Sequence, residues 1–188
     1  MKKLIILTII TLTFVGTNTA QKTVGGVTIP QKIMIGGTVL KLNGAGVREK
    51  FFMDMYACGL YVLTKTNKAE DVINSEKHTA IKIQIISGLI TSKKMTDAVE
   101  DGFKNATNGK TKPIRKEIDD FKKVFSKEEI KKGDIYDIIY VPSKGTVIFK
   151  NGKIQPIIKG QEFKKALFGI WLSDKPADKD LKKDLLTN

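Results

Sequence analysis

One arginine and one tyrosine are the residues of this sequence best suited to bind a small anion. Arg48 lies in an apolar stretch with Phe51 and Phe52, just after Asn43-Gly44-Ala45-Gly46, whose composition predicts a tight turn. A buried guanidinium needs a partner, and its planar fork of donors binds a carboxylate through two parallel hydrogen bonds. The hydroxyl of Tyr56, in the next predicted strand, could add a third bond. The pattern therefore indicates a carboxylate site.

An internal ion pair is the other interpretation of Arg48. Glu49 and Asp54 lie close to it in the sequence, and either could neutralise the guanidinium without any ligand. Ion pairs of this kind are common and contribute little to stability. From the residues alone, an ordinary paired or surface arginine is the simpler reading.

Several kinds of catalytic and metal site are excluded by composition. His78 is the sole histidine and Cys58 the sole cysteine, so a zinc site of histidines and cysteines cannot be assembled. No Gly-x-Ser-x-Gly motif presents a nucleophilic serine, and the apolar setting of Cys58 opposes a reactive thiolate and favours a small core residue. We therefore expect no metal, no cofactor and no catalytic residue of these classes.

The first twenty residues have the pattern of an export signal. Lys2 and Lys3 precede an apolar run from Leu4 to Val15, and small or polar residues follow up to Ala20. The run of about twelve residues is too short to span a bilayer comfortably. We expect cleavage near Ala20 and a periplasmic or secreted protein of bacterial type, with residues 21–188 forming one domain.

The net charge of +13 raises the question of nucleic-acid binding. The lysines are spread along the chain among acidic residues, and Arg48 and Arg115 are the only arginines, although arginine is the preferred base reader. We expect no nucleic-acid partner. A solvated basic surface is the simplest reading, with weak attraction to an anionic membrane surface as the next.

The hydrophobic pattern predicts the elements that must position Arg48 and Tyr56. After an irregular or edge-strand segment at 21–34, strands are predicted at 38–42, 47–52, 55–63, 80–86, 134–141, 146–150 and 153–158. Helices are predicted at 67–74, from Thr91 or Ser92 to just before Asn108-Gly109, at 114–125, at 161–172, and in a short segment after Pro176. This order predicts an α+β fold, an antiparallel sheet with helices layered on one face.

Two motifs resemble those of the chalcone isomerase-like family. The first joins Leu-Asn-Gly-Ala-Gly-Val-Arg, residues 42–48, then Lys-Phe-Phe, residues 50–52, and then Tyr-Ala-Cys-Gly-Leu-Tyr, residues 56–61; the second is the apolar stretch at 163–172. The resemblance covers nearly all of the chain after the export signal. It implies an open-faced β-sandwich, in which a large antiparallel sheet carries helices on one face with a ligand cleft between them.

The resemblance also assigns roles to particular residues. Members of the family are either isomerases that close the heterocycle of a chalcone or non-catalytic fatty-acid binders. Arg48 matches the arginine that faces the cleft in both groups, and Tyr56 matches the tyrosine that helps the fatty-acid binders hold the carboxylate. The isomerases carry further polar groups at positions that fall near Ile86, Met95 and Gly102 here. Their absence argues against chalcone cyclisation.

The predicted function is therefore non-catalytic binding of a fatty acid or similar small apolar carboxylate, with Arg48 and Tyr56 at its head group. The residues expected to line or back the cleft are Met95, Val99, Phe103, Phe168 and Trp171. Two alternatives remain open at this point. One is an isomerase or intramolecular lyase acting on an unknown substrate, in which Arg48 stabilises a developing anion. The other is a structural or interaction protein whose cleft is filled by its own side chains.

Overall fold

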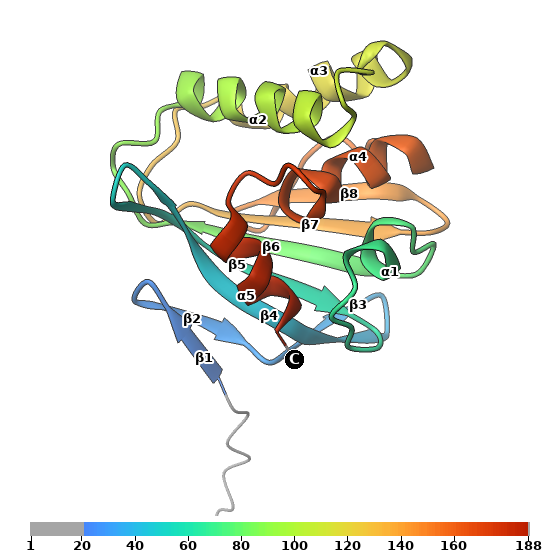
Figure 1. The fold of residues 1–188 in the computed structure, drawn as a ribbon, viewed down its shortest axis with the longest axis horizontal. Coiled ribbons are helices and arrows are strands. Elements are labelled where there is room, and N and C mark those ends of the chain that lie inside the picture. The colour runs from blue at the N-terminus through green and yellow to red at the C-terminus, as the bar shows by residue number, and fades with distance from the viewer. Residues whose placement is uncertain (1–20, 188) are drawn as a thin grey trace, which may run out of the picture.

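A computed structural model describes residues 21–187 as a curled antiparallel sheet with helices on one side (Figure 1). The sheet has seven strands in sequence order: β3 (Lys32–Ile35), β4 (Thr38–Lys50), β5 (Met53–Val62), β6 (Thr79–Ile85), β7 (Ile135–Val141), β8 (Gly145–Lys150) and β9 (Lys153–Ile154). A separate hairpin of β1 (Gln21–Val24) and β2 (Val27–Pro30) precedes it. The predicted export signal, residues 1–20, lies outside the described residues.

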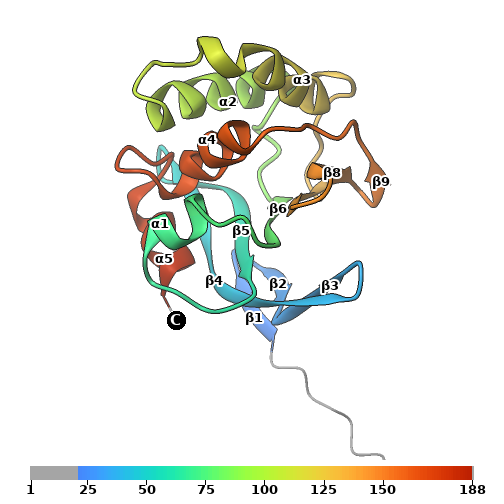
Figure 2. The ribbon, with the colours of Figure 1, turned by 90° about the vertical axis from the view of Figure 1, so that its right-hand side faces the viewer.

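The helices gather on the face of the sheet away from the β1–β2 hairpin (Figures 1 and 2). They are α1 (Ala69–Ile73), α2 (Ser92–Ala106), the 3₁₀ turn η1 (Lys112–Ile114), α3 (Arg115–Ser126), α4 (Gln161–Leu172) and α5 (Lys179–Leu186). None of these described helices is both long and apolar enough to span a membrane. The predicted α+β fold, an antiparallel sheet with helices layered on one face, is confirmed.

Local sequence signals explain where the predicted helices and turns begin and end. The Thr91 side chain accepts a hydrogen bond from the backbone N–H of Lys94, which satisfies a free donor at the start of α2. Asn108 and Gly109 follow the helix in left-handed conformations that these two residue types tolerate. The strand predicted at 153–158 is shorter than expected, since β9 ends at Ile154 before Pro156.

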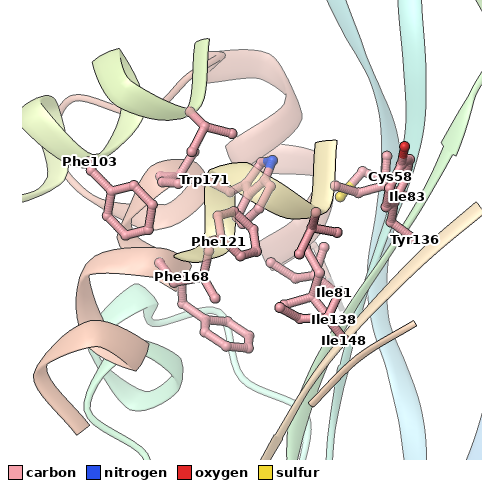
Figure 3. Close-up of a cluster of buried hydrophobic side chains, with 14 of the residues drawn as sticks. Cys58, Ile81, Ile83, Phe103, Phe121, Tyr136, Ile138, Ile148, Phe168 and Trp171 are labelled. Atoms are coloured by element: carbon pink, nitrogen blue, oxygen red, sulfur yellow. The ribbon is translucent and has the colours of Figure 1, made fainter. Parts of the chain in front are cut away.

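The main core lies between the sheet and the helices. Isoleucines at alternate positions of the strands, such as Ile81 and Ile83, point to this side because successive side chains of a strand face opposite ways. Figure 3 shows Phe121, Phe168 and Trp171 from the helices facing them. A second, smaller core lies between the opposite face of the sheet and the β1–β2 hairpin; it includes Ile29, Leu40, Ala57 and Tyr61.

The predicted turn at Asn43-Gly44-Ala45-Gly46 is wrong. These residues lie inside β4, which continues for 13 residues with a break in its pairing register between Leu42 and Gly44. A side chain on Gly44 would collide with the backbone of Asp184 and Leu185 in α5. The Asn43 side-chain amide donates a 2.7 Å hydrogen bond to the Leu185 carbonyl. The small residues at 43–46 therefore serve the close approach of α5 to the sheet.

Candidate functional site

Pairing of β4 with β5 sets Arg48 directly opposite Tyr56. The register shifts immediately afterwards, between Arg48 and Glu49, as the two strands approach their connecting turn. The guanidinium carbon lies 5.6 Å from the centroid of the Tyr56 ring, a distance at which the cation is attracted to the π-face. Arg48 is half-buried, whereas Tyr56 is buried in the main core. The Arg48 guanidinium therefore packs over the face of the Tyr56 ring.

The Tyr56 hydroxyl is hydrogen-bonded to helix α4. Trp171 of α4 donates a 2.9 Å hydrogen bond from its indole Nε1 to the Tyr56 oxygen. Burial raises the pKa of Tyr56 to about 12, although the nearby charge of Arg48 acts in the opposite direction. At neutral pH the phenol therefore keeps its proton and can still donate one hydrogen bond.

The Arg48 guanidinium lacks the internal partner that sequence reasoning considered. Its Nε is buried without a hydrogen-bond acceptor, and within residues 21–187 no carboxylate lies within 4 Å of its nitrogens. Glu49 and Asp54 are both exposed, and the backbone N–H of Glu49 donates instead to Asp178. A buried N–H without an acceptor is costly, so this arginine can still bind an anion.

Arg48 lies at the junction of two hollows. An outer groove of about 270 Å³ runs along the surface between the β4–β5 turn and the start of α2. Its apolar lining comes from Phe51, Met53, Met55, Leu89, Ile90, Met95 and Ala98. An inner cavity of about 30 Å³ lies between the sheet and the helices. It is lined by Arg48, Tyr56, Ile83, Met95, Ala98, Val99, Phe121, Phe125, Ile170, Trp171 and Ala177.

The cleft residues proposed from the sequence fall into two groups. Met95, Val99 and Trp171 line the inner cavity, and Met95 also borders the outer groove. Phe103 and Phe168 have no exposed surface and line neither hollow; the Phe103 ring stacks on another core phenylalanine. The structure thus brings three of the five to Arg48 and places the other two in the packed core.

Sequence reasoning missed most of the outer groove. Met53 and Met55 lie at the start of β5, the strand that carries Tyr56, and Leu89 with Ile90 lies in the connection from β6 to α2. The only sequence signal was the apolar character of residues 51–55 and 89–90, which fits a buried segment equally well. Their meeting at one groove depends on the Met55 carbonyl, which accepts hydrogen bonds from the backbone of residues 86 and 87.

The inner cavity is small compared with the ligands expected here. At about 30 Å³ it has room for one or two water molecules, whereas ligand pockets typically measure about 300–1,000 Å³. The rest of the space between sheet and helices is occupied by the aromatic and isoleucine side chains of the core (Figure 3). An alkyl chain could therefore enter the inner cavity only if core side chains moved, and the outer groove, at about 270 Å³, is the larger of the two hollows at Arg48.

Other reactive side chains lie away from Arg48. Cys58 is fully buried in the core, and burial raises the pKa of its thiol, which keeps it protonated. His78 borders a separate surface groove beside α1. Within residues 21–187 no group of three acidic, histidine or cysteine side chains could hold a metal ion.

Comparison with known proteins agrees with this architecture. Residues 21–187 match the model of a protein family described as chalcone isomerase-like, and no curated protein matches the chain significantly. Among solved structures, a fatty-acid binding protein of Arabidopsis thaliana superimposes with a TM-score of 0.66 at 17% sequence identity; the match covers 86% of this chain and 92% of that chain. At this identity the likeness establishes the fold alone. Because the family match spans the whole described sheet and its helices, the protein belongs to the chalcone isomerase-like family.

Proposed function

We propose that this protein binds a fatty acid or a similar small apolar carboxylate without catalysing a reaction. The observation that carries the proposal is the buried Nε of Arg48, which has no acceptor although it lies where an apolar groove meets the core. A carboxylate supplies two oxygens in the geometry that the guanidinium fork requires. The fatty-acid binding protein of the same fold supports this choice of ligand.

The alkyl chain would lie in the outer groove. Its walls include three methionines, Met53, Met55 and Met95, whose unbranched side chains adapt to ligands of different shape. Each methylene removed from water would contribute about 0.8 kcal/mol. Tyr56 would act mainly through its ring, by holding the guanidinium in place, with its remaining O–H available to the carboxylate.

The setting of this binding follows from the N-terminal pattern. An export signal at residues 1–20 would place the domain in a periplasm or outside the cell, where it would carry or scavenge its ligand. Detection of a chain beginning near Gln21 in the periplasmic fraction of its own host would support this placement, and a full-length cytoplasmic chain would contradict it.

Titration with a long-chain fatty acid tests the head-group contact. Loss of one partner of a buried charged contact typically costs about 2–5 kcal/mol, so Arg48→Ala should weaken binding about 30-fold or more. Arg115, the other arginine, forms ion pairs with Glu100 and Asp119 on the helical surface, so Arg115→Ala is the matched control and should bind like wild type. Equal affinities for wild type and Arg48→Ala would overturn the proposal.

One observation favours a second candidate. The filled space between sheet and helices is what a structural or interaction protein of this fold would show. The same titration separates the two functions, because such a protein would show no saturable binding of fatty acid even in wild type.

A further inference from the structure

The turn between β4 and β5 exposes aromatic side chains that contact little of the protein. Phe51 is 78% exposed and Phe52 fully exposed, and Met53 beside them is 40% exposed. Of the other phenylalanines in residues 21–187, Phe149 is half-buried and the rest are buried. In Figure 1 this turn projects at the left edge of the molecule, beside the connection that leads into α2. The two exposed rings therefore add nothing to the core.

The backbone of this turn makes the choice of residues more unusual. Phe51 and Phe52 have φ angles of 53° and 61°, both in the left-handed region. The turn between β8 and β9 has the same form, with φ angles of 51° and 75°, but it is made by Asn151 and Gly152, the residues that suit it best. Left-handed backbone is sterically unfavourable for a bulky side chain. Two phenylalanines that strain the turn and stay largely exposed point to a role outside folding.

The turn also forms one rim of the outer groove. Phe51 and Met53 line the groove together with Leu89, which is 49% exposed. Lys50 holds its ammonium 5.5 Å from the centroid of the Phe51 ring, and Lys94 lies on the same rim. The exposed apolar side chains thus surround the mouth of the groove, with both lysines and the carboxylates of Asp97 and Asp101 beside them.

Charge identifies the partner that these side chains would meet. Near the turn, exposed Glu49 and Asp54 offset the neighbouring lysines, so local attraction to an anion is weak. The full sequence, however, carries a net charge of +13, and the part from Gln21 onward, without Lys2 and Lys3, carries 13 − 2 = +11. This charge draws the protein toward an anionic surface over a distance of about 10 Å at ordinary salt. Aromatic rings at the tip then supply short-range affinity, as they do at membrane interfaces.

We infer that the Phe51-Phe52-Met53 tip docks the protein on the surface of an anionic lipid bilayer, with the mouth of the outer groove facing the lipid. The inference does not depend on fatty-acid binding, because the docking side chains are exposed whether or not the groove is filled. It adds to the proposed function a surface from which an apolar ligand could enter the groove without crossing water.

Vesicle co-sedimentation of the double variant Phe51→Asn, Phe52→Gly tests the inference. The variant recreates the residues of the β8–β9 turn, so the hairpin should keep its form and lose strain. We expect its Tm to rise by about 3 °C or more, while binding to vesicles of phosphatidylcholine and phosphatidylglycerol falls about tenfold or more. All proteins compared should begin at Gln21, because both cores lie after it and the apolar run before it would itself bind lipid.

A second double variant controls for loss of any exposed apolar surface. Ile154 and Ile157, 61% and 44% exposed, lie at the far edge of the sheet, and their joint replacement by serine should leave vesicle binding unchanged. The inference is overturned if the Asn-Gly variant still binds the mixed vesicles or if wild type binds pure phosphatidylcholine equally well. Sedimentation velocity that reveals a dimer abolished by the Asn-Gly variant would overturn it in favour of self-association.

Discussion

Lys164 and Arg48 are cations that both lie against the aromatic core, and their surroundings differ. Lys164 of α4 has no exposed surface, and its ammonium lies 5.1 Å from the centroid of the Phe168 ring. It donates three hydrogen bonds to backbone carbonyls at the end of α1, to Val72 at 2.6 Å, Ile73 at 2.9 Å and Ser75 at 2.7 Å. Each of its three donors therefore has an acceptor.

Arg48 is less buried but less well satisfied. Tyr56 offers it a ring face, and its Nε has no acceptor among the described residues. Buried polar groups in folded proteins almost always have partners. Lys164 uses all of its donors within the protein, so its role is to stabilise the fold. The Nε of Arg48 still lacks an acceptor among the described residues, so a ligand oxygen would form its most favourable hydrogen bond there.

Replacing Lys164 by methionine should produce the largest loss of stability. The change would remove the ammonium donor from three buried or partly buried carbonyls at the end of α1. The Val72 and Ser75 carbonyls would each keep only one longer bond, of 3.3 Å. We expect the free energy of unfolding in urea to fall by about 3 kcal/mol, with fatty-acid affinity unchanged in the folded fraction. A loss below about 1 kcal/mol would show that the hydrogen bonds of Lys164 contribute little to stability, and so that Lys164 does not differ from Arg48 in this respect.

Arg48→Ala should show the opposite balance. Because the substitution removes an N–H that lacks an acceptor, we expect stability to stay within about 1 kcal/mol of wild type while ligand affinity falls. Urea unfolding alongside the fatty-acid titration measures both quantities on one preparation. A large loss of stability would place Arg48 with Lys164, as a residue needed for folding.

Much of the fold could be predicted because the signals are local. Alternation of Ile81, Ile83 and Ile85 predicted β6, and the Asn-Gly pair at 151–152 predicted the last hairpin. The turn predicted at 43–46 was wrong because these small residues are needed for close packing against α5, which is distant in the sequence. Asn43 binds the Leu185 carbonyl 142 residues away along the chain, and no local pattern reveals that.

The candidate site was predictable only in part. The family motifs singled out Arg48 and Tyr56, but their pairing across β4 and β5 and the lack of an internal acid could be seen only in the structure. Lys164 and Lys165 look alike in the sequence, yet one is buried and the other half-buried. Helical spacing offered an unused signal, since Lys164 lies four residues before Phe168 and so shares its apolar face.

The pH dependence of stability tests whether Lys164 contributes to folding as its burial predicts. Burial lowers the pKa of Lys164 from its ordinary 10.5 to about 8. Between these values the unfolded chain binds more protons than the folded one, so the stability of wild type should rise with pH from about 8 to about 10.5. Lys164→Met should lack this rise when both are unfolded in urea across the range. The three carbonyls that accept from Lys164 favour its charged form and oppose the effect of burial. If the stability difference between wild type and Lys164→Met stays flat or falls over this pH range, the carbonyls have the larger effect on the pKa.

Replacing Tyr56 by phenylalanine should have the smallest effect on fatty-acid affinity. It tests whether the ring or the hydroxyl of Tyr56 supports Arg48 in binding. The ring face under the guanidinium is kept, so we expect fatty-acid affinity to change less than about threefold. The Trp171 indole N–H loses its acceptor, which should lower stability by about 1–2 kcal/mol. Tyr56→Leu, which also removes the ring, should weaken binding further. If Tyr56→Phe instead weakens binding as much as Arg48→Ala, the hydroxyl itself holds the carboxylate, and arginine and tyrosine together form the head-group site.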